Sequence, residues 1–279
     1  PMSVAFNLVI DTAAPVVPAI TAISPDTGIV GDGITSANGI VLSGASDPNN
    51  TLYLYQDAVL IGQTVSDGAG NWSYDHSSIA LVDGTYSFLA VAEDVAGNRS
   101  TSAVYAIAVD TGLPAAPAIT AMTTDTGVLG DLITGDNTLL FGGTSEADAS
   151  IEVFVGGTSV GTTTANGSGV WTFDHSGTTL SDGAYSITAT AQDASGNTSA
   201  ASSAYAITVD TGLPAAPAIT AMTTDTGVLG DLITGDNTLL FSGTSEADAS
   251  IEIFIGASSV GTTTARDKSG IKCPCPLKK

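Results

Sequence analysis

The chain repeats itself about every hundred residues, and this period constrains its fold more than any single motif does. The stretch VDTGLPAAPAITAMTTDTGVLGD stands at 109–131 and again, letter for letter, at 209–231. Residues 109–165 and 209–265 differ at only five positions. A period of this length indicates tandem structural units, each large enough to bury a core of its own.

The period also predicts where the units begin and end. We expect residues 1–10 to be the last strand of a truncated preceding repeat, 11–109 and 110–209 to be Ig-like repeats, 210–265 to be an incomplete repeat, and 266–279 to be a foreign or artefactual tail. The tail stands apart because it carries five of the six basic residues and both cysteines. Because the incomplete repeat lacks the later strands of a unit, we expect it to be poorly packed.

The charge balance is strongly acidic, with 28 Asp and Glu residues against six Lys and Arg residues and a formal net charge of −22. Such a surface repels nucleic acid and anionic membranes and attracts cations. We therefore expect no binding of nucleic acid. No apolar run is long enough to span a bilayer, so we also expect no membrane insertion. The repeats contain no cysteine, and the short run Cys273-Pro274-Cys275 in the tail does not define a metal or redox site by itself.

The apolar residues follow the period of β-strands. Tyr185, Ile187, Ala189 and Ala191 alternate with polar residues, which is the pattern of a half-buried strand. Clusters of Gly, Asn, Asp and Ser separate this run from others like it. About seven short strands in a hundred residues is typical of an immunoglobulin (Ig)-like sandwich. We therefore predict an all-β chain of tandem Ig-like β-sandwiches, arranged as a rod.

Two motifs strengthen the prediction of a sandwich. The runs LVDGTY at 81–86 and LSDGAY at 180–185 place a Gly in a turn and a Tyr at the start of the next strand, as in a tyrosine corner. Trp72 recurs as Trp171, and we expect both indoles to lie in the core, which is the commoner use of a tryptophan in a sandwich.

Four motifs in a fixed order resemble a known family. They are Asp-Thr-x-x-Pro-x-x-Pro-x-Ile, Asp-Thr-Gly-x-x-Gly-Asp, the strand Asn-Trp-Ser-Tyr or Val-Trp-Thr-Phe, and Ala-x-Asp-x-x-Gly-Asn. Over residues 4–265 the chain resembles the bacterial Ig-like repeats of giant, type I secreted adhesins and biofilm-associated surface proteins. The resemblance implies a secreted, non-catalytic, calcium-stiffened stalk at the bacterial cell surface. It also implies that a host or abiotic surface is bound through other domains, while the repeats contact their neighbours in the chain.

The tripeptide Asp-Thr-Gly occurs five times, which raises the alternative of an acid protease. Such an enzyme needs two of these loops facing each other, so that their carboxylates share one proton. Only the copies at 110–112 and 210–212 follow an apolar residue as in the protease pattern, and each is followed at once by Leu-Pro at a junction between units. We therefore favour a structural role for the tripeptide and predict that the chain is not an enzyme.

The acidic residues recur at positions that a sandwich brings to the junction between units. Asp26 and Asp32 of one unit should approach the linker at Asp110, where the loop 193–197 and Glu146 of the next unit return. Crowded carboxylates repel one another unless a hard cation bridges them, and calcium accepts six to eight oxygen ligands. We therefore predict calcium, with ligands among Asp11, Asp26, Asp32, Asp94, Asn98, Asp110, Asp125, Asp131, Glu146, Asp193, Asn197 and Asp210. The alternative is that these residues only form turns by bonding their own backbone.

Asp75-His76-Ser77 and its copy Asp174-His175-Ser176 contain the residue types of a hydrolase triad. Adjacent residues of a strand point to opposite faces, so they cannot form a chain of hydrogen bonds. We expect these runs to be the ends of exposed strands.

Three functions stay open at this point. The first is a structural stalk module of a secreted bacterial surface adhesin. The second is an Ig-like module that binds carbohydrate or a host surface, and the third is an accessory repeat of a large secreted enzyme. The near-identity of 109–165 and 209–265 favours the stalk, because a dedicated binding site tends to occur once.

Overall fold

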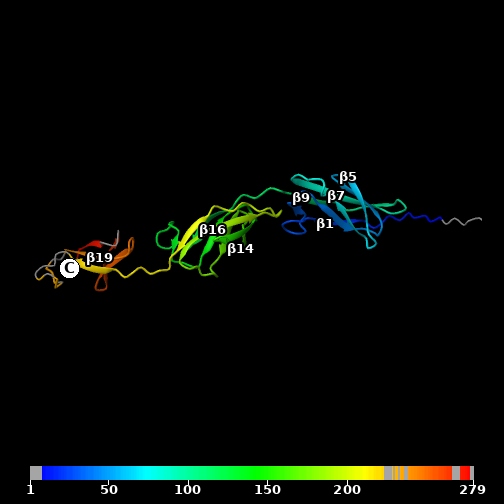
Figure 1. Ribbon diagram of the computed structural model, residues 1–279. Coiled ribbons are helices and arrows are strands. Elements are labelled where there is room, and N and C mark those ends of the chain that lie inside the picture. Colours follow the sequence, from blue (N-terminus) through cyan, green and yellow to red (C-terminus); the bar gives the residue numbers. More distant parts are fainter. Residues whose placement is uncertain are drawn as a thin grey trace, which may run out of the picture. The chain divides into compact units, whose positions relative to one another are not determined.

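The computed structural model describes residues 8–222, 228, 230–231, 233–235, 238–265 and 271–276. Every regular element within these ranges is a β-strand, which confirms the predicted all-β class. The chain divides into two compact units, Pro1–Asp210 and Thr211–Lys279. The first unit contains two Ig-like sandwiches in tandem (Figure 1).

The described residues contain no helix that is long and apolar enough to cross a membrane.

The first sandwich packs a three-stranded sheet against a larger one. The smaller sheet has the order β1 (Ala19–Ser24), β3 (Val41–Ala45), β6 (Asn71–Asp75). The larger sheet has the order β2 (Ile34–Thr35), β9 (Tyr105–Val109), β7 (Gly84–Glu93), β4 (Thr51–Gln56), β5 (Val59–Val65), with β8 (Arg99–Thr101) also beside β7. Only β2 and β9 pair in parallel, and the other pairs are antiparallel.

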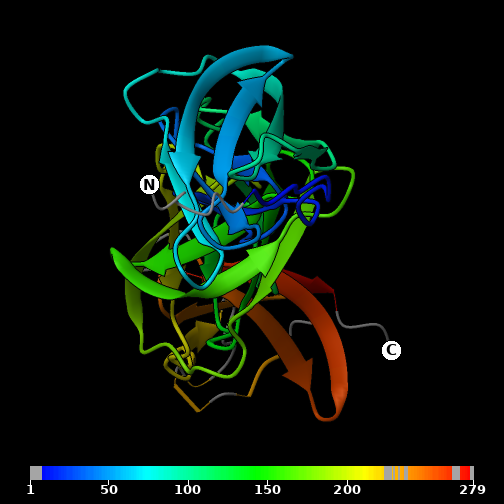
Figure 2. The same cartoon turned by 90° about the vertical axis from the view of Figure 1, so that its right-hand side faces the viewer.

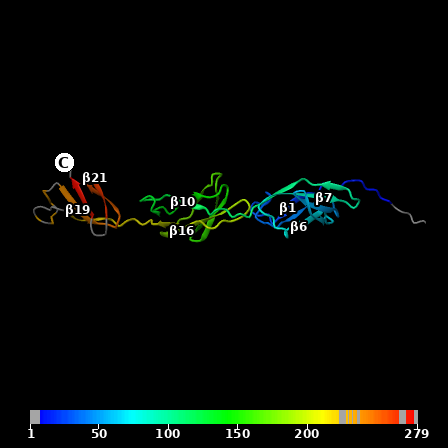
Figure 3. The ribbon, with the colours of Figure 1, turned by 90° about the horizontal axis from the view of Figure 1, so that it is seen from above.

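The second sandwich repeats this topology. Its smaller sheet has the order β10 (Ala118–Thr123), β12 (Leu140–Thr144), β15 (Val170–Asp174). Its larger sheet has the order β11 (Ile133–Thr134), β17 (Tyr205–Val209), β16 (Gly183–Gln192), β13 (Ser150–Val155), β14 (Thr158–Thr164). Strands β10 and β16 mark the two sheets in Figure 3. Sequence periodicity does not find β2 and β11, because two residues are too few to show alternation.

The strands curve and twist, as the light-blue strands of the first sandwich and the green strands of the second show in Figure 2. Their inward residues fill one core per sandwich. Leu42, Leu54 and Phe88 are fully buried in the first core. Phe141 and Ile187 are at most 1% exposed in the second.

The two tryptophans lie in these cores, as predicted, with exposed fractions of 4% for Trp72 and 1% for Trp171. Each indole lies against a glycine of the neighbouring strand. A Cβ atom on Gly44 would come within 2.5 Å of the Trp72 ring, and one on Gly143 within 2.5 Å of the Trp171 ring. The glycines of β3 and β12 therefore make room for the indoles.

The predicted tyrosine corners are confirmed in both sandwiches. The hydroxyl of Tyr86 donates to the main-chain oxygen of Val82 at 2.8 Å. The hydroxyl of Tyr185 donates to the main-chain oxygen of Ser181 at 2.9 Å. Each tyrosine lies four residues after its acceptor, so the bond fixes the turn that leads into β7 or β16.

The prediction that both histidines lie at exposed strand ends is wrong. His76 and His175 are only 4% and 7% exposed. The N–H of His76 donates to Ile40 O at 2.9 Å, so the residue after β6 stays bound to the neighbouring segment and its ring points inward. Its Nε2 lies 3.1 Å from Gln56 Oε1, and burial lowers its pKa against the opposing effect of Asp75. Asp75 itself accepts from the Ser77 N–H, so these residues do not form a triad.

The second compact unit contains two small sheets. One has the order β18 (Ala218–Met222), β19 (Thr238–Thr244), β22 (Ile271–Pro276), and the other pairs β20 (Ser250–Ile255) with β21 (Ser258–Thr264). Strand β22 belongs to the tail and pairs with β19 as β15 pairs with β12 in the second sandwich. Phe254 and Ile255 are 54% and 39% exposed.

Candidate functional site at the repeat junction

The linker between the two sandwiches begins at Asp110, directly after β9, and the first sandwich fixes its opening residues. The Asp110 N–H donates to Thr35 O at 3.0 Å. The N–H and hydroxyl of Thr111 both donate to Asp83 Oδ1 at 2.9 Å. Gly112 N–H donates to Asp110 Oδ1 at 2.9 Å. The Asp-Thr-Gly tripeptide at 110–112 is thus a turn held by the end of the first sandwich.

The second sandwich holds the same linker from the other side. The side-chain amide of Asn197 donates to Asp110 O at 2.8 Å, and the hydroxyl of Ser195 donates to Asp110 Oδ2 at 3.3 Å. Further along, Ala115 N–H donates to Glu146 Oε1 at 2.8 Å. Asp110 is therefore bonded by both sandwiches at once.

The loop between β16 and β17 that reaches Asp110 is closed by its own aspartate. Asp193 Oδ1 accepts from the Asn197 N–H, and Asp193 Oδ2 accepts from the Asn197 side-chain amide, both at 2.9 Å. This closure leaves the second amide hydrogen of Asn197 for Asp110. The Asp-x-x-Gly-Asn pattern therefore builds a loop that is closed by its own side chains and still offers an amide hydrogen of its asparagine to Asp110.

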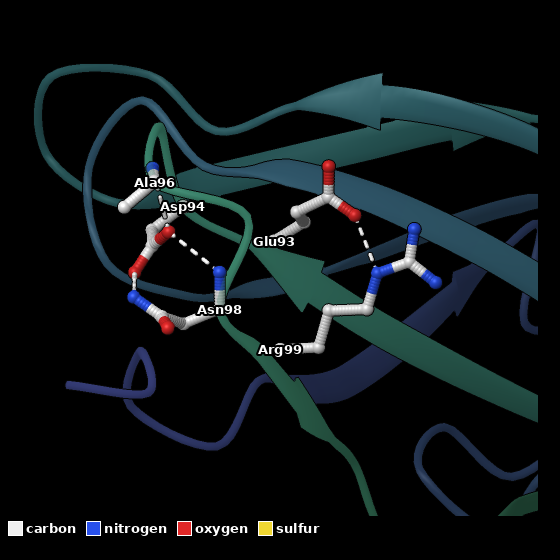
Figure 4. Close-up of polar contacts among 5 residues, drawn as sticks. All are labelled: Glu93, Asp94, Ala96, Asn98 and Arg99. Atoms are coloured by element: carbon white, nitrogen blue, oxygen red, sulfur yellow. Dashed lines mark hydrogen bonds and ion pairs between the residues drawn. The ribbon is translucent and has the colours of Figure 1, made fainter. Parts of the chain in front are cut away.

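The first sandwich builds the same loop from Asp94 and Asn98 (Figure 4). The Asn98 side chain, followed by the main-chain amides of the loop, holds the pKa of Asp94 below its usual value. The Asn98 amide also donates to Asp11 O at 3.3 Å. Beside this loop Arg99 pairs with Glu93, as Figure 4 shows.

The loop between β1 and β3 faces the junction and carries a buried oxygen that lacks a donor. Asp26 Oδ2 accepts from the Gly31 N–H at 2.7 Å, whereas Asp26 Oδ1 is buried without a hydrogen-bond partner among the described residues. Asp125 repeats both features, with Oδ2 bonded to the Gly130 N–H at 2.6 Å. A buried carboxylate oxygen without a donor or a cation is costly. This is the one feature of the acidic set that turn formation does not account for.

Each of these two aspartates lies near a tyrosine of the same sandwich. Burial, together with the negative charge of Asp26, raises the pKa of Tyr105. Burial and Asp125 raise that of Tyr205.

The other candidate ligands lie in turns at the ends of the sandwiches. Asp32 Oδ1 and Asp131 Oδ1 accept from the amides of Ile34 and Ile133 at 2.8 and 2.9 Å. Asp11 Oδ1 accepts from the Ala13 N–H at 3.0 Å. The Asp210 N–H donates to Thr134 O at 2.9 Å, as Asp110 does to Thr35.

Hydrogen bonds at the junction link Asn197 to both Asp110 and Asp193, whereas Glu146 binds the linker five residues further on, at Ala115. Thr27, the neighbour of Asp26, donates to Ser195 O at 2.5 Å. Within the described ranges, no three side chains of His, Cys, Asp or Glu gather closely enough to hold a metal by themselves. Carbonyl, hydroxyl and amide oxygens would therefore have to complete a calcium site. The calcium ligand set stays a prediction.

The sequence places the loop 193–197 at the junction, but it does not single out three residues that make contacts there, namely Thr27, Asp83 and Ser195. Asp83 lies in the run LVDGTY, whose Gly and Tyr predict the tyrosine corner, but nothing in this run predicts that the aspartate binds the linker. Thr27 and Ser195 carry no signal of their own in the sequence, because their contact depends on how two sandwiches meet.

The family of the chain follows from a match to a family model. The model described as bacterial Ig-like domain matches residues 12–111 and 113–211. The chain belongs to the bacterial Ig-like domain family. A second bacterial Ig-like domain model, of group 3, matches residues 169–255. No curated protein matches the chain. The resemblance inferred from the ordered motifs is thereby confirmed at the level of the Ig-like family.

Several solved structures are similar to this bacterial Ig-like chain. The fibronectin(III)-like modules of Clostridium thermocellum CbhA are 18% identical with a TM-score of 0.44, over 69% of this chain and 93% of theirs. A Ca2+-stabilized adhesin that helps an Antarctic bacterium bind ice is 22% identical with a TM-score of 0.41, over 94% of this chain and 66% of its own. The BSP domain of a biofilm associated protein is 18% identical with a TM-score of 0.27, over 71% of this chain and 30% of its own.

Proposed function

We propose that the chain is a non-catalytic stalk module of a secreted bacterial surface adhesin, stiffened by calcium at the junctions between repeats. The observation that carries the proposal is that both sandwiches bind Asp110. It accepts hydrogen bonds from the second sandwich, and its N–H donates to the first. A linker bonded on both sides transmits force and orientation from one repeat to the next. Those are the tasks of a stalk.

The repetition of the units supports a stalk over a module with its own ligand. Residues 109–165 and 209–265 differ at five positions, and the loops at the junction recur with the same residue types. The acidic surface keeps such an extended chain soluble outside the cell. In this account the partners of the repeats are their neighbours in the chain, and domains outside these residues bind a host or abiotic surface.

The residues at the junction fit calcium in two respects. The buried oxygen Asp26 Oδ1 has no donor among the described residues, and a cation would compensate its charge. The carboxylate, carbonyl and hydroxyl oxygens of the residues at the junction are hard donors, which calcium prefers and binds in flexible geometry. Asp26 and Asp110 would hold the ion, together with oxygens of the loop 193–197. When bound, calcium would neutralise the acids and bridge the two sandwiches.

Calcium titration by calorimetry tests this assignment. We expect binding with a dissociation constant of about 10⁻⁴ to 10⁻³ M, the range of extracellular modules. Asp26→Asn and Asp110→Asn keep the oxygens that accept from Gly31 and Gly112 but remove the charge, so they should weaken binding without unfolding the chain.

Asp67→Asn is the matched control, because Asp67 caps the turn before β6 by the same kind of bond and lies outside the candidate set. Calcium binding that is unchanged in Asp26→Asn and Asp110→Asn would contradict the junction as the calcium site.

A further inference from the structure

Two loops from successive sandwiches meet through their main chains at the junction. The hydroxyl of Thr27 donates to Ser195 O at 2.5 Å. A Cβ atom on Gly28 would lie 2.1 Å from Ala194 O and 2.9 Å from Gly196 N, and one on Gly196 would lie 2.7 Å from Gly28 N. Contacts this short with backbone atoms leave no room for a side chain. The two loops approach as closely as they do because both carry glycine.

The same two loops occur once more in the first compact unit without such a contact. Gly127 has φ +77° where Gly28 has +71°, and Gly97 has φ +87° where Gly196 has +88°. A Cβ atom on Gly127 or Gly97 would meet no described atom within 4 Å. The backbone conformations are thus equal within each pair, and only the surroundings differ. The positive φ angle favours glycine at all four sites. At Gly28 and Gly196, the close contact with the other loop is a second reason for glycine.

We propose that Thr27-Gly28 is a docking surface for the Asp-x-x-Gly-Asn loop of the following Ig-like repeat, and that this contact sets the orientation of successive repeats without a metal. The partner is therefore another repeat of this type. The second sandwich carries the same surface at Thr126-Gly127, which would receive the corresponding loop of a further complete repeat. The inference rests on the proposed stalk function and adds to it a contact that does not need calcium. We call this contact, between Thr27-Gly28 and residues 194–196, the latch.

The contact surface is small, but the linker makes docking intramolecular. A short tether gives the loop a high effective concentration at its surface, so a few contacts are enough to select one arrangement. The bonds from Asn197 and Ser195 to Asp110 anchor the same loop at the start of the linker. The recurrent Asp-Thr-Gly tripeptide thus has two structural uses: at 26–28 it receives a loop, and at 110–112 it forms the linker turn.

Spin-label distance measurements on the full chain test the latch. The labels would replace Ser73 and Thr172, which are exposed and hold equivalent positions on β6 and β15, with Cys273 and Cys275 changed to Ser. All samples would contain a chelator, so that calcium does not contribute. We expect a narrow distance distribution in the parent chain, and a broadened or shifted one in Gly28→Ala and Gly196→Ala.

The matched controls are Gly127→Ala and Gly97→Ala. They impose the same positive-φ strain, but the added methyl group would contact no described atom within 4 Å. Both should keep the narrow distribution. The latch is overturned if the parent distribution is broad with chelator, if Gly28→Ala and Gly196→Ala leave it narrow, or if the controls broaden it equally. A distribution that is broad with chelator and narrow with calcium would overturn the latch while supporting the calcium-stiffened stalk.

Discussion

The side-chain amide of Asn197 donates to the main-chain oxygen of Asp110 at 2.8 Å, and Asn98 makes the corresponding bond to Asp11 at 3.3 Å. In both sandwiches, the last residue of the Asp-x-x-Gly-Asn loop therefore binds the residue at which its own repeat begins. The recurrent asparagine ties the start of each repeat to a loop close to its end.

Replacing Asn197 by Ala should destabilise the second sandwich. The substitution removes a hydrogen bond to Asp110 and another to Asp193, each worth about 1 kcal/mol net. Chemical denaturation followed by the fluorescence of Trp171, in a chain where Trp72 is Phe, would measure the loss. Asn98→Ala is the control and should leave this transition in place, since its bonds belong to the first sandwich.

Replacing Gly143 by Ala should destabilise the second sandwich by about 1–3 kcal/mol, because the new methyl group overpacks the core. It would meet Ala118 O at 2.0 Å and the Trp171 ring at 2.5 Å. The neighbouring change Gly142→Ala is the control, since its nearest atom would be Trp171 O at an ordinary 3.6 Å. Equal unfolding free energies for the two variants would contradict the proposed packing of the indole.

The first sandwich should lose stability as the pH falls from about 7.5 to about 5, the range in which histidine titrates. Burial lowers the pKa of His76 below its ordinary 6.5, so the unfolded chain takes up the proton first. The stability contributed by the neutral ring is thus complete above the ordinary value and decreases as pH falls through it.

Urea denaturation at both pH values, with His76→Phe for comparison, measures this effect. The variant should show a weaker pH dependence. Asp75 does not contribute to the change between pH 7.5 and 5, because hydrogen bonds from Ser77 lower its pKa from 3.8. The stability that its carboxylate contributes is therefore lost only in more acidic solution. The same pH dependence in both proteins would rule out His76 as the cause.

Limited proteolysis should cut within 211–265 before it cuts within 8–210. Phe254 and Ile255 are 54% and 39% exposed, and the buried cluster of this segment, among its described residues, consists of Ile251, Ile253 and Ala265. A cluster this small makes local opening of β20 and β21 cost little free energy. Mass spectrometry of the first cleavage products would locate the sites, and early cuts in β13 or β16 would contradict this order.

The sequence predicts most of the fold because the relevant signals are local and repeated. Alternation in 183–192 predicts β16, and the Gly and Tyr of 81–86 predict the tyrosine corner. The buried state of His76 escapes prediction, because it depends on one main-chain bond beyond the end of β6. The contact between Thr27 and Ser195 escapes for a different reason, since it arises only when two sandwiches are placed together.

The recurrence of acids could be recognised from the sequence, but its two uses could not be separated. Asp32 and Asp131 bond nearby amides, which is the turn-forming alternative. Asp26 and Asp125 bond an amide with one oxygen and bury the other without a partner among the described residues. Only the geometry of individual carboxylate oxygens distinguishes a turn former from a candidate ligand.

Thermal unfolding of the chain with millimolar calcium, compared with chelator at equal ionic strength, tests the calcium-stiffened stalk most directly. A site with a dissociation constant of about 10⁻⁴ M would contribute about 1.4 kcal/mol under these conditions. For a sandwich of this size, that corresponds to a rise in melting temperature of several degrees. We expect this rise in the native chain and its loss in Asp110→Asn. Equal melting temperatures in calcium and in sodium would contradict it.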